Sequence, residues 1–128
     1  MERQRVSTGT EWESQVGYSR AIRAGDTVRV AGTIATDDEG EVVAPGQPYE
    51  QTKHALGIVT DALDELDASA ADVVATRMYV TDMAYMDDVG RAHGEVFGDV
   101  RPAATMVVVS GLAADGAVVE VEAEAVLD

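Results

Sequence analysis

The sequence has no cysteine, which excludes disulfide bonds, thiolate catalysis and cysteine metal sites. It has two histidines, and it lacks a His-Glu-x-x-His motif, a nucleophile elbow and a glycine-rich phosphate loop. We therefore expect no metal site. No apolar run approaches the roughly 18 residues that a membrane helix needs, and residues 1–10 contain no apolar signal segment. These absences predict a soluble, cytoplasmic protein that does not associate with a membrane.

Positive charge is also scarce: the sequence has nine basic residues and 24 acidic ones, and Lys53 is the single lysine. The formal net charge of −15 disfavours nucleic acid as a partner, since phosphate backbones are bound through clustered lysine and arginine. The acidic residues are dispersed along the chain instead of forming one block. Dispersed acidic charge is typical of a halophilic protein whose self-repulsion is screened by salt.

Apolar and acidic residues alternate near the C-terminus. The odd positions from 119 to 127 are all apolar, whereas positions 120, 122 and 124 are glutamates. This period of two is typical of a strand with one buried face. A second apolar run follows Arg101, so residues 101–127 predict two adjacent strands that close a sheet.

The remaining pattern predicts an α+β fold with the order β-β-α-β-α-β-β. Its 46% hydrophobic content over 128 residues fits one domain, residues 1–128, with its own core. The predicted elements before residue 101 are a hairpin of strands at 16–22 and 27–31, a loop at 36–48, a helix at 50–66, a strand at 73–80, and a helix from 86 that ends at Gly98. Two helices would then cover one face of a mixed sheet. The other face, with apolar and mixed positions, would need another subunit to cover it.

Three individual side chains invite a functional interpretation. His93 lies on the apolar stripe of the second helix, where a packed and hydrogen-bonded role is favoured over ligand binding. His54 is expected to be exposed. Trp12 either caps an apolar edge, which is the favoured role, or stacks on a ligand.

Several short segments, taken together, resemble the reactive-intermediate deaminase (Rid, YjgF-type) family. They are Gly17-Tyr18-Ser19, the strand at 28–34, Gly40-Glu41-Val42-Val43, Gln51, Tyr79-Val80-Thr81-Asp82 and Pro102-Ala103-Ala104-Thr105 with the last strand. The resemblance implies a chorismate-mutase-like fold and a homotrimer with small-molecule pockets between subunits. It also implies hydrolysis of enamines or imines without a cofactor.

The resemblance also implies site residues. A tyrosine and a last-strand glutamate of the family match Tyr18 and Glu120, whereas a family serine and arginine fall on Ala31 and Ala104. That arginine binds the carboxylate of an imino acid, a contact worth roughly 1.5–3 kcal/mol. An α-imino acid is therefore no longer the obvious substrate.

Two arginines are candidates to replace the missing charge. Arg20 is two residues from Tyr18 and is expected to share its strand face, whereas Arg101 immediately precedes Pro102. We favour Arg20 of the two. A surface ion pair with one of the many acidic residues is an alternative role for either arginine.

In the enzyme that the resemblance implies, Glu120 activates water and Tyr18 orients the substrate. The binding residues include Gly32, Thr33 and Thr105, with backbone N–H groups near Gly32 and Thr105 polarising the substrate. Glu120 is alternatively one of three glutamates on a solvated strand face. A non-catalytic metabolite binder, acting as sensor, scaffold or chaperone, is the alternative function, and an endoribonuclease is disfavoured by the charge.

The charge generates a first prediction. A homotrimer would carry three times −15, or −45, formal charges. The Debye length falls from about 30 Å at 0.01 M salt to about 3 Å at 1 M, so the melting temperature should rise over this range. Thermal unfolding followed by circular dichroism measures it. An unchanged melting temperature would contradict the halophilic interpretation.

Overall fold

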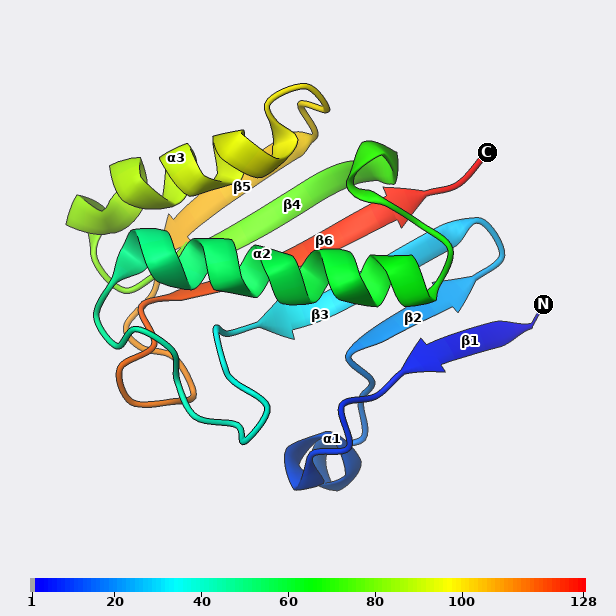
Figure 1. The fold of residues 1–128 in the computed structure, drawn as a ribbon, viewed down its shortest axis with the longest axis horizontal. Coiled ribbons are helices and arrows are strands. Elements are labelled where there is room, and N and C mark those ends of the chain that lie inside the picture. Colours follow the sequence, from blue (N-terminus) through cyan, green and yellow to red (C-terminus); the bar gives the residue numbers. More distant parts are fainter. Residues whose placement is uncertain (1) are drawn as a thin grey trace.

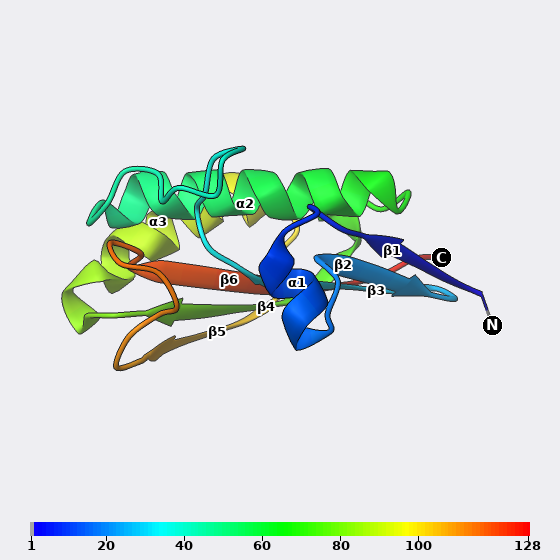
Figure 2. The same cartoon turned by 90° about the horizontal axis from the view of Figure 1, so that it is seen from below.

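The computed structural model describes residues 2–128 and contains a six-stranded sheet with two long helices on one face (Figure 1, Figure 2). The elements are β1 (Arg3–Val6), α1 (Glu11–Val16), β2 (Ala21–Ala24), β3 (Thr27–Thr33), α2 (Pro48–Glu65), β4 (Val73–Val80), α3 (Met86–Phe97), β5 (Ala103–Val108) and β6 (Val119–Val126), with 3-10 turns at Ala70–Asp72 and Met83–Tyr85. The predicted α+β class with two helices on one sheet face is confirmed.

The core forms between the sheet and α2, as the periodicity predicts. The odd residues of β6, Val119 to Ala125, are buried in one core cluster with residues of α2, the helix that lies over this side of the sheet (Figure 2). The apolar stripe of α2 supplies Leu56, Val59 and Leu63, all fully buried. Burying side chains of this size stabilises the fold by roughly 1.5–3 kcal/mol each. The alternation of apolar and polar residues therefore determines which face of the sheet the helices pack against.

The predicted strand at 16–22 is wrong. Val16 instead ends helix α1, and Gly17 caps that helix in the left-handed conformation with φ 88°. The strand starts only at Ala21, and the hairpin to β3 then turns at Gly25 and Asp26. Helix α1 is not predicted from the sequence, because its six residues are too few to show a helical repeat of apolar residues. Strand β1 was also missed, since it is a short polar edge strand.

The last two strands are not neighbours, which corrects the prediction for residues 101–127. The sheet order is β1-β2-β3-β6-β4-β5, so β6 lies between β3 and β4. Helix α3 carries the chain back along the sheet, so β5 pairs in parallel with β4 and becomes an edge strand. β6 then pairs antiparallel with both β3 and β4. Helix α3 does end before Gly98, although this glycine has φ −55° and is not a left-handed cap.

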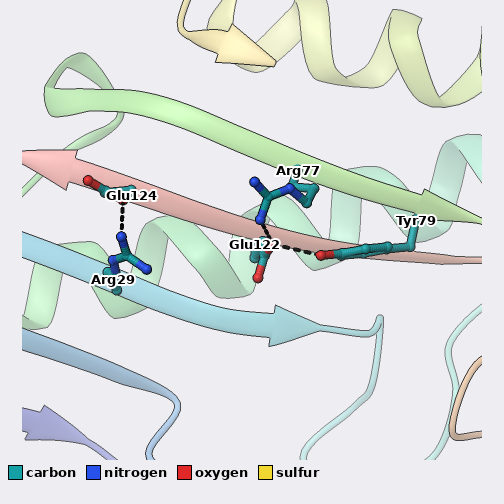
Figure 3. Close-up of polar contacts among 5 residues, drawn as sticks. All are labelled: Arg29, Arg77, Tyr79, Glu122 and Glu124. Atoms are coloured by element: carbon teal, nitrogen blue, oxygen red, sulfur yellow. Dashed lines mark hydrogen bonds and ion pairs between the residues drawn. The ribbon is translucent and has the colours of Figure 1, made fainter. Parts of the chain in front are cut away.

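The sheet face opposite the helices is uncovered within residues 2–128 (Figure 2), and three polar contacts cross β3, β6 and β4 on it (Figure 3). Glu122 accepts hydrogen bonds from Arg77 and Tyr79, each at 2.7 Å. Glu124 pairs with Arg29 at 2.8 Å. Of the three glutamates on β6, Glu120 is therefore the one that has no ion-pair partner within 4.0 Å among residues 2–128.

Candidate functional site

Tyr18 lies in the turn after helix α1, not on a strand. The backbone N–H groups of Gly17 and Tyr18 both donate to the carbonyl oxygen of Glu13, at 2.9 and 3.0 Å. The chain can turn this tightly after helix α1 because Gly17, which has no side chain, adopts the left-handed conformation. Tyr18 is therefore fixed by the C-terminal cap of α1, and the predicted strand face shared with Arg20 does not exist.

Arg20 nevertheless lies close to Tyr18. Its guanidinium carbon is 5.5 Å from the centre of the Tyr18 ring, a distance at which a cation interacts favourably with an aromatic face. Its Nη1 donates to the Gly32 carbonyl oxygen at 2.9 Å and contacts the Thr33 hydroxyl at 3.2 Å. The Nε of Arg20 is buried and has no hydrogen-bond partner in the described chain. The guanidinium of Arg20 is thus held between the Tyr18 ring and the end of β3, with its Nε buried and unpaired.

Gly32 and Thr33 lie where the register between β3 and β6 shifts after Val30. Such an irregularity locally redirects the backbone. Thr33 is buried, and its hydroxyl donates to the Ala31 carbonyl oxygen at 2.8 Å. A β-carbon on Gly32 would lie 2.9 Å from both Cδ and Oε2 of Glu120. Glycine at this position therefore lets the carboxylate rest directly against the strand.

Glu120 differs from the two glutamates that follow it on β6. It is half-buried, and the pKa of its carboxyl is raised because burial disfavours the charged form. The positive charge of Arg20 opposes this rise, and the negative charge of Glu122 adds to it. A carboxyl that ionises above its usual range can exchange protons with a substrate more readily near neutral pH. The structure thus distinguishes Glu120 from its neighbours, which the alternating sequence cannot do.

The structure brings together five of the seven predicted site residues. The cluster consists of Tyr18, Arg20, Gly32, Thr33 and Glu120, and we call it the Glu120 cluster. Its members come from the α1–β2 turn, the end of β3 and the start of β6. Chain segments far apart in sequence therefore form one polar site at the side of the sheet that the helices leave open.

Arg101 and Thr105 do not join this cluster within one chain. Thr105 is exposed on the edge strand β5, which β4 separates from β6. Arg101 precedes β5 and is exposed, with φ 56°. Ala104, where the resembling family has arginine, is exposed on the same strand.

Three further candidate side chains have structural positions. His93 bonds the Thr76 hydroxyl at 2.8 Å and packs beside Phe97, which confirms its predicted role, and burial lowers its pKa. His54 is half-buried and bonds the Thr36 carbonyl oxygen at 2.7 Å, so its predicted exposure is wrong. Trp12 is 59% exposed.

The sequence analysis missed Glu13. This residue is buried at 4% exposure, and its carboxylate accepts hydrogen bonds from the Ser7 and Thr8 hydroxyls and from the Thr8 backbone N–H. The sequence does contain a pattern that predicts a helix start here, because Thr10 and Glu13 have the spacing of a helix-capping box. The Thr10 hydroxyl does accept the Glu13 N–H at 3.2 Å, although the glutamate side chain turns to the preceding loop.

A shallow hollow on the open sheet face is distinct from the Glu120 cluster. Its lining includes the already paired residues Arg29, Arg77, Glu122 and Glu124. Across residues 2–128, no three histidine, aspartate or glutamate side chains are grouped to hold a metal ion. No helix in the same range is long and apolar enough to span a membrane. The Glu120 cluster is thus the candidate site with an unpaired acid and an unpaired guanidinium edge.

The close approach of Gly32 to Glu120 generates a second prediction. Gly32→Ala should displace the Glu120 carboxylate toward solvent, because the new β-carbon would occupy its place, and the pKa of Glu120 should fall toward its usual value. Carboxyl NMR titration measures this change. Gly57→Ala is the matched control, since a β-carbon there meets nothing within 4 Å. An unaltered Glu120 titration in Gly32→Ala would contradict the described contact.

The comparisons with known proteins agree with this fold. The family model described as Endoribonuclease L-PSP matches residues 8–127. The Streptomyces coelicolor protein SCO2049 is 43% identical over 94% of this chain and 90% of its own length. A protein of Acinetobacter baylyi named 3-aminoacrylate deaminase RutC is 30% identical over 81% of this chain and 82% of its own.

A solved structure extends the comparison to three dimensions. The crystal structure of Rv2704 from Mycobacterium tuberculosis, described as a member of the YjgF/YER057c/UK114 family, superposes with a TM-score of 0.89. The two sequences are 44% identical, and the match covers 98% of this chain and all of the other. The resemblance seen in the sequence motifs is confirmed, and the chain belongs to the endoribonuclease L-PSP family, known also as the YjgF/Rid family.

Proposed function

We propose that the chain forms a homotrimer in which each Glu120 cluster faces a neighbouring subunit, and that this site hydrolyses small enamines or imines. The observation that carries the proposal is the half-buried Glu120 carboxyl, whose pKa is raised by burial and which rests on the Gly32 backbone beside Arg20. A polar site open to the uncovered sheet face supports a location between subunits. The net charge of −15 supports a partner other than nucleic acid, and the proposal includes a cytoplasmic location.

Hydrolysis of an imine requires one group that moves protons in both directions. Glu120 takes a proton from water as the water oxygen bonds to the imine carbon, and it gives this proton to the nitrogen. The same transfer, from the new hydroxyl group to nitrogen, accompanies cleavage of the carbon–nitrogen bond. The products are a carbonyl compound and ammonia. An enamine enters this sequence after a proton moves to its carbon.

The other cluster residues hold the substrate. The Tyr18 ring and hydroxyl orient it, while the positive charge of the Arg20 guanidinium, beside the Tyr18 ring, attracts an oxygen-bearing group. Backbone N–H groups at Gly32 and, from a neighbouring subunit, at Thr105 polarise the reacting group. Arg101 of that neighbour is the alternative cation. The relative named 3-aminoacrylate deaminase supports this reaction class.

A second candidate function is binding without turnover, as a metabolite sensor, scaffold or chaperone. The observation that favours it is the pair Ala31 and Ala104, which removes a hydroxyl and a guanidinium from the positions that the resembling deaminases use. Both candidate functions use the same pocket, and neither requires a cofactor. They differ in whether Glu120 transfers protons.

The proposed assembly generates a third prediction. Light scattering in molar salt should give a particle near three times the 13.5 kDa chain mass. The uncovered face contains the exposed apolar residues Val74 and Val107, but ion pairs dominate its centre, so polar as well as apolar contacts should hold the subunits. A stable monomer at micromolar concentration would remove the intersubunit site.

The reaction generates a fourth prediction. The protein should hydrolyse 2-aminoacrylate slowly, because Ala104 supplies no guanidinium to its carboxylate, whereas an imine without a carboxylate should turn over. Ala104→Arg should raise kcat/KM for 2-aminoacrylate about 10- to 100-fold, as expected for one charge-assisted pair. Ammonia release measures both rates.

Two variants serve as controls for this reaction. Glu120→Gln should abolish turnover, and Glu124→Gln, on the same strand but paired with Arg29, should not. If Glu120→Gln keeps full activity, the glutamate does not move the protons. If no imine or enamine turns over while small ligands still bind, the non-catalytic function is supported instead.

A further inference from the structure

Helix α1 is held to the rest of the chain by a carboxylate instead of an apolar face. It has six residues, and isolated helices of this length are marginal in water, so contacts with the rest of the chain must stabilise it. Its two large apolar side chains, Trp12 and Val16, are 59% and 57% exposed. Glu13 is the buried residue of this helix, at 4% exposure. The contacts that anchor α1 are therefore those of Glu13.

The side chain of Glu13 bonds the loop that precedes the helix. Its Oε1 accepts hydrogen bonds from the Ser7 hydroxyl at 2.9 Å and from the Thr8 backbone N–H at 3.2 Å, and its Oε2 accepts one from the Thr8 hydroxyl. Burial alone raises the pKa of Glu13, but the hydrogen bonds from Thr8 and Ser7 lower it below its usual value. The carboxylate is thus charged at neutral pH, and hydrogen bonds to a charged acceptor are the stronger kind.

The backbone of Glu13 holds the turn that carries Tyr18. The Glu13 carbonyl oxygen accepts the N–H groups of Gly17 and Tyr18 at 2.9 and 3.0 Å. The Glu13 N–H donates to the Thr10 hydroxyl at 3.2 Å, which caps the start of the helix. One residue thus connects the loop before α1 to the turn after it.

Arg20 is held by different contacts. Its N–H donates to the Val6 carbonyl oxygen at 2.8 Å, and its carbonyl oxygen accepts the Ala31 N–H at 2.9 Å. Its guanidinium is bonded to the end of β3. Arg20 is therefore fixed by β1 and β3, whereas Tyr18 is fixed by α1. The 5.5 Å approach of the Arg20 guanidinium to the Tyr18 ring depends on how α1 is held against the sheet.

We propose that Glu13 is a positioning residue of the Glu120 cluster: its buried carboxylate anchors α1 and so keeps the Tyr18 ring beside Arg20. The consequence for catalysis, that a substrate oriented by Tyr18 depends on this anchor, rests on the proposed function. The anchoring itself is a property of the folded chain and is measured without a substrate.

The test is NMR spectroscopy of the Glu13→Gln variant without substrate. The amide of glutamine has one acceptor oxygen in place of two and carries no charge, so it cannot reproduce the bonds to Ser7 and Thr8. Hydrogen exchange of the Gly17 and Tyr18 amides should become roughly 10- to 100-fold faster, as expected when a hydrogen bond to a charged group is lost. The nuclear Overhauser contacts between the Tyr18 ring and the Arg20 side chain should weaken.

Two references separate positioning from a general loss of stability. Glu11→Gln is the matched control, because Glu11 is an exposed glutamate in the first turn of the same helix. The Ala31 amide, which donates to Arg20, should keep its exchange rate in Glu13→Gln. The proposal is overturned if Glu13→Gln changes Tyr18 no more than Glu11→Gln does. Equal acceleration at Ala31 overturns it too, since the whole sheet has then loosened.

A second variant tests the same contact from the loop if Glu13→Gln does not fold. Thr8→Val removes one hydroxyl donor and keeps both the side-chain shape and the Glu13 charge. It should produce the same changes at Tyr18 with smaller amplitude. An unaltered Tyr18 in Thr8→Val contradicts the anchoring.

The activity arm uses a carboxylate-free imine. Glu13→Gln should lower kcat/KM roughly 10- to 100-fold when Tyr18 is present, as expected for a misplaced orienting group, and should lower it no further in the Tyr18→Ala background. Equal losses in both backgrounds overturn the proposal, because Glu13 then acts by another route. If no variant hydrolyses the imine but the NMR changes occur, the positioning stands and the proposed function fails.

Discussion

The alternation of apolar and acidic residues along β6 is the constraint on which both the core and the candidate site depend. β6 lies between β3 and β4, with α2 on one side of the sheet (Figure 1, Figure 2). Its odd residues are buried in the core with residues of α2, so its glutamates point to the uncovered side. A register slip of one residue would bury three carboxylates and expose the core. The core thus determines that Glu120, Glu122 and Glu124 share one face.

The surroundings then give these three glutamates different roles. Glu122 accepts hydrogen bonds from Arg77, which faces it on β4, and from Tyr79, which lies two residues further along β4. Glu124 pairs with Arg29, which faces it on β3 (Figure 3). At the position facing Glu120 the β3 register is broken, and Gly32 presents backbone instead of a side chain. A paired acid is a poor proton carrier because its ionised form is stabilised. The irregularity of β3 therefore leaves one glutamate suitable for chemistry.

The sequence predicts those parts of the fold that burial imposes. α2 and β6 follow from periodicity because each has one face against the core, and β4 follows from its β-branched and aromatic residues. It does not predict the order of the sheet, since nothing local in β5 indicates that it pairs with β4 instead of β6. Tyr18 and Glu120 could be selected from family-like motifs. Their meeting with Arg20 depends on Gly17, on the α1 cap and on the Glu13 contacts, which are tertiary features without a periodic signature.

The two carboxyls near Arg20 make opposite contributions to stability. Glu13 has a lowered pKa, so its stabilising contribution is present above its ordinary pKa and is lost as the pH falls through the folded value. Glu120 has a raised pKa, so its ionisation destabilises the fold as the pH rises above its ordinary pKa toward the folded value. At neutral pH the well-bonded Glu13 offsets part of the strain at Glu120. A carboxyl with a raised pKa can thus be kept in a half-buried place because the neighbouring turn that carries Tyr18 is anchored by the well-bonded Glu13.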